Sequence, residues 1–419
     1  MRPLLCAIVA SLLLVPARLA MQGQNPPRGG GQPMFRSSTA LVEVDAIVHD
    51  REGRFATGLR AEDFEIFEDG KPQNIQQFYM VTHEPGGSVT SEHADATDYR
   101  ARRVFVILFD EAHLANDSLM RVKEGAAAFI RDRMGPDDVG GVFVNGGMHK
   151  GRLTTDKGQL LAGVHAVKPA FDNRQALLAP FELFPRIPGE RDATRIAEGA
   201  RELVDALGIK ACREYRAECE LNGGLNQVEN LIEQKARLYV RQARILADRT
   251  AQSLQTVARG LSRIPGRKTV VFLSEGFYLE DSRGLIEAIA AQAARGGTTI
   301  YSIDGRGLIG APSPTSSVVT TERGRSTAFD TGDDGPNILT ANTGGFMVRN
   351  IDDMSRAFGM IVRDTSTYYV IGYQPANSTM DGKYRKIDVK SKVAGLRVRA
   401  RKGYAALALP PQESLLGGR

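Results

Sequence analysis

The side chains best suited to chemistry follow a short apolar run. Residues 104–109 read Val-Phe-Val-Ile-Leu-Phe, and Asp110, Glu111 and His113 come directly afterwards. Carboxylates and an imidazole can act as general acids or bases, and such a mixed set would also admit Zn²⁺ or Mn²⁺. Of the six histidines, only His113 follows a predicted strand directly, and no two have metal-ligand spacing. A solvated loop histidine is the alternative that we favour.

Motifs of nucleophilic and nucleotide chemistry are missing or incomplete. The sequence contains no G-x-S-x-G and no H-E-x-x-H, which are signatures of serine hydrolases and zinc peptidases. Residues 305–310 match G-x-G-x-x-G, but Ala-Pro-Ser-Pro follows at 311–314. A dinucleotide fingerprint must open a helix there. We therefore expect neither a nucleotide site nor, as the preferred hypothesis, an enzyme.

Two cysteines, Cys212 and Cys219, lie beyond the N-terminal segment. In an oxidising compartment they are the natural disulfide pair. A straight helix would separate them by about 10.5 Å along its axis, whereas bridging needs Cα atoms within roughly 7 Å. A disulfide therefore requires a non-helical turn between them, and without such a turn both stay unpaired.

The N-terminal segment has the pattern of an export signal. Residues 1–20 combine Arg2, an apolar run from Leu4 to Val15 and small residues near Ala20. We interpret them as a signal peptide, followed by a disordered leader at 21–38 that is rich in Gly, Pro and Gln. The protein is then expected in the periplasm or outside the cell, without a transmembrane segment after signal removal. Its basic and acidic residues are interspersed, so we expect no nucleic-acid partner.

Buried strands alternate with amphipathic helices in the middle of the chain. This order predicts an α/β fold with a mainly parallel, Rossmann-like sheet and helices on both faces. The strands expected in this sheet are Val104–Phe109, Val139–Val144, Thr269–Leu273, Thr298–Ile303 and Tyr368–Gly372.

Other segments depart from this alternation. Between about residue 170 and residue 260, apolar residues recur at helical spacing and few segments have the pattern of a strand, which predicts a helical insertion. An N-terminal β unit at 39–82 and a C-terminal β hairpin at 376–406 are each too short to bury a core alone, so we expect them to pack together. The remaining parts are a linker at 83–100, a surface loop at 306–336 and a tail at 407–419.

The order of these segments resembles a known family. The strings that carry the resemblance are LVEVDAIVHDREGRFATGLRAEDFEIFEDGKPQNI, VFVILFDEAH, LTTDKGQLL, GRKTVVFLSEGF, TTIYSIDGRG, TGGFMVRNIDDM and YYVIGYQPANSTMDGKYRKIDVKSKVAGLRVRARKGY. Together they are similar to the bacterial VWFA-related domain family and span most of residues 39–406. The resemblance implies a von Willebrand factor A-like domain at 101–375 and export, but no known substrate.

The resemblance also implies a metal-ion-dependent adhesion site, which is degenerate here. A-type domains hold Mg²⁺ through an Asp-x-Ser-x-Ser loop, a Thr and a further Asp. This chain keeps Asp110 but has Ala112 and Leu114 at the serine positions, and Glu275 replaces the second Asp. Thr194 is a weak match for the Thr, and Glu111 and His113 could contribute. We expect no required cofactor and at most weak binding of Mg²⁺ or another divalent cation; the alternative is that Asp110 and Glu275 only cap helices or pair with basic residues.

The function that we predict is a binding module for a protein or peptide partner in the cell envelope. The partner would meet the loops at the carboxyl ends of the central strands, where open α/β sheets place ligands. The alternative is a metal-dependent hydrolase using Asp110, Glu111, His113 and Glu275, which would require these side chains to converge in one pocket. A purely structural envelope protein is a third possibility.

Overall fold

A computed structural model describes residues 41–83, 89–91, 102–277, 283–308 and 334–411. The expected signal peptide and leader, most of the linker and most of the 306–336 loop lie outside these residues. Among the described residues, no helix combines the length and the apolar composition that crossing a bilayer requires.

The central sheet has six strands in the order β11-β10-β9-β6-β7-β8. All neighbouring pairs are parallel except β7 with β8. Four of the five strands predicted for this sheet are present in it. Its strands are β6 (Val104–Phe109), β7 (Val139–Val144), β8 (Gly147–Met148), β9 (Lys268–Ser274), β10 (Thr298–Asp304) and β11 (Met347–Val348).

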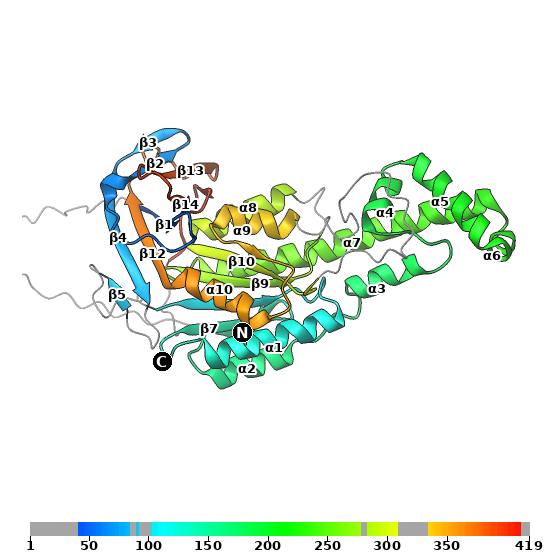
Figure 1. Ribbon diagram of the computed structural model, residues 1–419, viewed down its shortest axis with the longest axis horizontal. Coiled ribbons are helices and arrows are strands. Elements are labelled where there is room, and N and C mark those ends of the chain that lie inside the picture. Colours follow the sequence, from blue (N-terminus) through cyan, green and yellow to red (C-terminus); the bar gives the residue numbers. More distant parts are fainter. Residues whose placement is uncertain (1–40, 84–88, 92–101, 278–282, 309–333, 412–419) are drawn as a thin grey trace, which may run out of the picture. The chain divides into compact units, whose positions relative to one another are not determined.

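Helices flank both faces of this sheet (Figure 1). One face packs on α1 (Asn116–Asp132), α2 (Lys157–Ala166) and α10 (Met354–Ser366), and the other packs on the second half of α7 (Leu225–Leu261) with α8 (Arg283–Arg295) and α9 (Asp334–Thr343). Strands covered on both faces must be apolar throughout, which is why β6 and β7 are uninterrupted runs of buried residues. The architecture is α/β and compatible with a Rossmann-like fold.

The segments that flank the central domain build two further sheets. The first has the order β14-β1-β12-β4-β5, and the second has the order β15-β13-β2-β3. The N- and C-terminal segments pair through β1 with β14 and through β2 with β13. These strands are β1 (Val42–His49), β2 (Phe64–Glu68), β3 (Lys71–Gln73), β4 (Ile75–His83), β5 (Val89–Ser91), β12 (Thr367–Tyr373), β13 (Tyr384–Ser391), β14 (Arg397–Arg399) and β15 (Gly403–Ala405).

The prediction for residues 368–372 was wrong in one respect. They form β12, but this strand lies antiparallel between β1 and β4 rather than in the central sheet. Alternate residues of β12 enter two different apolar clusters, one with Tyr369 and Ile371 and the other with Tyr368 and Val370. Burial of both faces requires a continuous apolar run in β12, and the same pattern is typical of a parallel strand. Strand β5 also lies within the expected linker.

The helical insertion has a core of its own. Its elements are α3 (Arg174–Leu178), a short 3-10 helix (Ala179–Glu182), α4 (Glu190–Ala197), α5 (Arg201–Glu214), α6 (Arg216–Leu221) and the first half of α7. Two further 3-10 helices, Ala61–Asp63 and His149–Gly151, lie outside the insertion. Val204, Val228 and Ile232 are among its buried residues. Helix α7 continues onto the central sheet, where Leu254 and Val257 are buried against it. One helix thus serves both the insertion and the central core.

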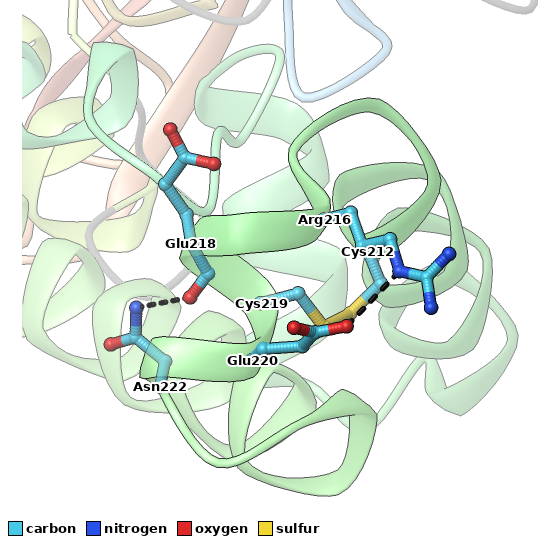
Figure 2. Close-up of a disulfide and its surroundings, with 6 residues drawn as sticks. All are labelled: Cys212, Arg216, Glu218, Cys219, Glu220 and Asn222. Atoms are coloured by element: carbon cyan, nitrogen blue, oxygen red, sulfur yellow. Dashed lines mark hydrogen bonds and ion pairs between the residues drawn. A yellow bond between two sulfur atoms is a disulfide. The ribbon is translucent and has the colours of Figure 1, made fainter.

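The insertion contains a disulfide between Cys212 and Cys219, whose Cα atoms are 5.0 Å apart (Figure 2). Helix α5 ends at Glu214, and Tyr215 leaves the helical region with φ −128° and ψ 67°. This break shortens the distance that a continuous helix would impose. Arg216 and Glu220 form an ion pair at 3.0 Å on the following helix.

Candidate functional site

Asp110 lies at the centre of a hydrogen-bonded cluster at the carboxyl end of β6. Thr250 Oγ1 donates to its Oδ1 at 2.6 Å, and Ser274 Oγ donates to its Oδ2 at 2.7 Å. His113 Nδ1 lies 3.2 and 3.1 Å from the same two oxygens and 3.0 Å from Thr250 Oγ1. Both oxygens of the carboxylate are therefore occupied by groups of the protein itself.

These contacts keep Asp110 ionised although it is buried. Burial alone would raise the pKa of its carboxyl, but the charge on His113 and the hydrogen bonds from His113, Thr250 and Ser274 together lower that pKa. A buried charge is tolerated where enough donors satisfy it. The cluster thus ties the loop after β6 to helix α7 and to the end of β9.

A threonine contacts Asp110, and it is a different residue from Thr194, the weak match in the sequence. Thr194 lies in α4, and its hydroxyl donates to the carbonyl of Glu190 in the same helix. The threonine that contacts Asp110 is Thr250, 140 residues away in the chain. It sits in a regular helix, where nothing in the local sequence marks it. Ser274 directly follows the predicted strand Thr269–Leu273, so its position at the sheet edge was the only available signal.

Glu275 has a separate role from Asp110. Its Oε1 accepts a hydrogen bond from the N–H of Ala115 at 2.8 Å, at the start of α1. A carboxylate at this position satisfies a free N–H and complements the helix dipole. Its backbone carbonyl accepts from Arg174 Nη1 at 3.0 Å, and its Oε2 lies 3.9 Å from the same nitrogen.

Arg174 supplies a built-in positive charge beside this position. The side chain is only 6% exposed, and its Nη2 donates to Glu190 Oε2 at 2.5 Å. Tyr239 donates to the other oxygen of Glu190 at 2.9 Å. Burial would lower the pKa of Arg174, but Glu190 and then Glu275 raise it above its ordinary value. A guanidinium of the insertion therefore neutralises carboxylates at the edge of the sheet.

The residues present do not fit a Mg²⁺ site of the adhesion type. Ala112 and Leu114, which stand where the resemblance implies two hydroxyl ligands, are buried and apolar. The oxygens of Asp110 are already satisfied, and Glu275 faces a guanidinium. Within the described ranges, no group of three or more His, Cys, Asp or Glu side chains is arranged to hold a metal ion.

A cavity of about 340 Å³ opens beside the cluster, between the ends of β6 and β7 and helix α7. Residues from the sheet, the following loops and α7 form its walls: Leu108, Phe109, Asp110, Glu111, Ala112, Phe143, Asn145, Gly146, Ala170, Arg249, Thr250, Gln252, Ser253, Thr256 and Phe272. The carboxyl edge of a parallel sheet is the usual place for a ligand in this kind of fold.

Glu111 is the acidic residue of this cavity whose hydrogen bonding is incomplete. Its Oε2 accepts from the N–H of Asn145 at 3.0 Å. Its Oε1 is shielded from solvent and accepts no hydrogen bond of normal geometry within the described residues. Burial raises the pKa of Glu111; the N–H groups of Asn145 and Lys168 oppose this increase, and the charge of Asp110 adds to it.

The turn that presents Asn145 to Glu111 has a local cause. Asn145 and Gly146 have φ values of 51° and 75° and connect β7 to its antiparallel partner β8. Asn-Gly is the residue pair that most readily adopts such a left-handed two-residue turn. The turn forms one wall of the cavity and holds Glu111 in place.

The four residues of the hydrolase hypothesis do not all line this cavity. Asp110 and Glu111 line it, whereas His113 and Glu275 do not. His113 is 5% exposed and lies against Phe277, with 5.4 Å between ring centroids. Its placement is that of a buried structural partner of Asp110, which corrects the expectation of a solvated loop histidine.

Neither a scan with protein-family models nor a search of curated proteins finds a match for this chain. Solved structures similar to it include an aerotolerance-related membrane protein from Bacteroides fragilis, carrying multiple mutations to serine, and BatB, a conserved hypothetical protein from Bacteroides thetaiotaomicron. Each is 14% identical to this chain with a TM-score of 0.32; the matches cover 62% and 63% of this chain and 97% of each of those chains. The function must therefore be argued from the site.

Proposed function

We propose that this protein is an exported, von Willebrand factor A-like binding module that holds a protein or peptide partner at the carboxyl edge of its central sheet. The observation that carries the proposal is the open cavity at the ends of β6 and β7, with Glu111 in its wall. A disulfide in the insertion agrees with an oxidising compartment. The predicted signal at residues 1–20 supplies the route of export.

Partner binding does not depend on a metal ion in this proposal. The carboxylate that would anchor the ion, Asp110, is bound to Thr250, Ser274 and His113. Any affinity for Mg²⁺ or Mn²⁺ is therefore expected to be weak. Calorimetry on the purified protein tests this: micromolar affinity that Asp110→Ala abolishes would restore a metal-dependent adhesion mechanism.

Affinity capture from an envelope extract tests the binding role. The wild type and Ser253→Tyr, which places a large side chain on the cavity wall of α7, are compared with and without chelator. Glu214→Gln, on the exposed surface of α5, is the control variant. We expect a partner retained by the wild type and the control, lost with Ser253→Tyr, and unaffected by the chelator. Capture that is equal for all three variants would contradict a role for the carboxyl edge.

A further inference from the structure

The cavity beside Asp110 has two chemically distinct sides. Leu108, Phe143 and Phe272 are apolar and come from three adjacent strands of the sheet. Helix α7 contributes polar side chains that include Ser253 and Thr256. Such a lining suits a ligand with an aliphatic stem and a polar end, because the stem can cover apolar surface while the end meets hydrogen-bonding groups.

The charges around the cavity favour a ligand whose polar end is a cation. Arg249 is the basic residue of the lining, but its Nη1 lies 2.7 Å from Asp172, which offsets its charge. Asp110 already has three donors of its own. The N–H groups of Asn145 and Lys168 act on the carboxylate of Glu111, but its Oε1 accepts no hydrogen bond of normal geometry in the described part of the chain, so Glu111 keeps the greatest capacity to bind a further donor.

We infer that the cavity is a recognition pocket for a basic side chain, lysine or arginine, of the partner, with Glu111 as its counter-charge. The inference rests on the proposed function and names the chemistry of its contact. The stem of the basic residue lies along the apolar side, and its charged head approaches the Glu111 carboxylate. The terminal carboxylate torsion of Glu has a broad energy well, so a modest rotation presents an oxygen to the ligand.

Other ligand classes fit these walls less well. An anion would meet Asp110 and Glu111, and the one guanidinium in the lining is already paired with Asp172. A transition metal would find no group of three His, Cys, Asp or Glu side chains in the described part of the chain. A neutral apolar group would leave the carboxylate of Glu111 without compensation, which is costly in a partly buried site.

The test measures binding of small probes to the purified full chain by calorimetry, in the absence of any partner. Nα-acetyl-lysine amide and Nα-acetyl-arginine amide are the basic probes, and Nα-acetyl-norleucine amide is the uncharged counterpart of the lysine probe. Nα-acetyl-glutamate amide tests the anionic alternative. We expect a basic probe to bind at least about tenfold more tightly than norleucine amide, as a charged hydrogen bond implies.

Two cavity variants and one control locate the binding. Glu111→Gln should reduce the affinity for the basic probe by about tenfold, because it removes the charge but keeps the shape. Ser253→Tyr should reduce the affinity for all probes, and Glu214→Gln should leave them unchanged. Thermal unfolding of each variant confirms that it folds.

Three results would overturn the inference: equal affinity for lysine and norleucine amides, equal affinity of wild type and Glu111→Gln for the basic probes, or preferential binding of the glutamate probe. These results are separable from failure of the proposed function. A partner captured equally by wild type and Glu111→Gln supports the binding role but contradicts the basic-residue pocket. Glu111-dependent binding of the lysine probe supports the pocket even where capture from the extract fails.

Discussion

Arg174 brings one positive charge into contact with two glutamates from different parts of the chain. Glu190 belongs to the insertion and Glu275 to the edge of the central sheet. All three side chains are no more than 12% exposed, so each charge depends on its partners rather than on water. Removing one member of such a group leaves the others buried and uncompensated.

We therefore expect Arg174→Met to destabilise the protein by about 3–5 kcal/mol. The matched control is Arg249→Met, which breaks an ion pair with Asp172 whose side chains are 48% and 54% exposed; it should cost less than about 1 kcal/mol. Urea unfolding at neutral pH measures both. Similar losses in the two variants would show that burial does not decide the value of these pairs.

Strand β4 ends in a histidine that makes part of the stability dependent on pH. His83 lies beside Tyr368 of β12, with ring centroids 6.3 Å apart. Burial, and then the charge of Arg103, lower the pKa of His83 from 6.5 to about 4; Asp138 opposes this change and Arg267 adds to it. Between these two values the unfolded chain binds more protons than the folded chain, so stability must fall as the pH falls.

This difference in the pKa of His83 corresponds to about 3 kcal/mol in the free energy of unfolding. The full amount is present above a pH of about 6.5 and is lost as the pH falls to about 4. His83→Phe removes the titration while keeping an aromatic ring against Tyr368. Urea unfolding at about pH 7, 5.5 and 4, which spans the range between the two pKa values, should show a shallower decline in stability for the variant. Parallel pH profiles for the two proteins would exclude His83 as the cause.

The helix pair α5 and α6 depends on its disulfide more than on its surface ion pair. Replacing Cys212 and Cys219 by serine reopens a short loop, which should cost the local structure roughly 2 kcal/mol. Hydrogen exchange should accelerate near Tyr215 and leave β6 and β9 unchanged. Arg216→Gln breaks the neighbouring i,i+4 ion pair with Glu220 and should lower the local stability by only about 0.3 kcal/mol. Faster exchange in the central strands would contradict an independent role for the insertion.

At the scale of the whole molecule, two largely buried arginines join the flanking sheets to the central domain. Arg267 precedes β9, lies 4.2 Å above the ring of Tyr368 and pairs with Asp45 of β1 at 3.3 Å. Arg401 donates to the carbonyl oxygens of Glu43 and Ala294. These contacts couple elements that are distant in the chain, so the two parts should unfold together.

Arg267→Met should lower the stability by about 2 kcal/mol, through loss of the cation–π contact and the ion pair. Arg397→Met, at an exposed position of β14, is the control and should change it by less than about 0.5 kcal/mol. Far-ultraviolet circular dichroism and tyrosine signals should give one coincident transition in the wild type. Two separate transitions would show that the sheets are energetically independent.

The sequence by itself determined the elements whose patterns are local. Strands β6, β7, β9 and β10 were predictable because burial on both faces requires uninterrupted apolar runs. The need for a turn between Cys212 and Cys219 followed from helix geometry alone. The apolar side chains of Ala112 and Leu114 after Asp110 were likewise visible without a structure.

Tertiary structure alone decided which segments meet. The apolar run of β12 is compatible with either sheet, and its antiparallel pairing with β1 and β4 is fixed by packing across about 300 residues of chain. Thr250 reaches Asp110 because α7 crosses from the insertion onto the central sheet. Glu111 meets the Asn145 turn because β6 and β7 are neighbouring parallel strands that end at the same edge of the sheet, and Arg174 of α3 reaches Glu275 at this edge. Local patterns specify which face of an element is buried, whereas contacts between polar side chains of distant elements depend on how those faces are brought together.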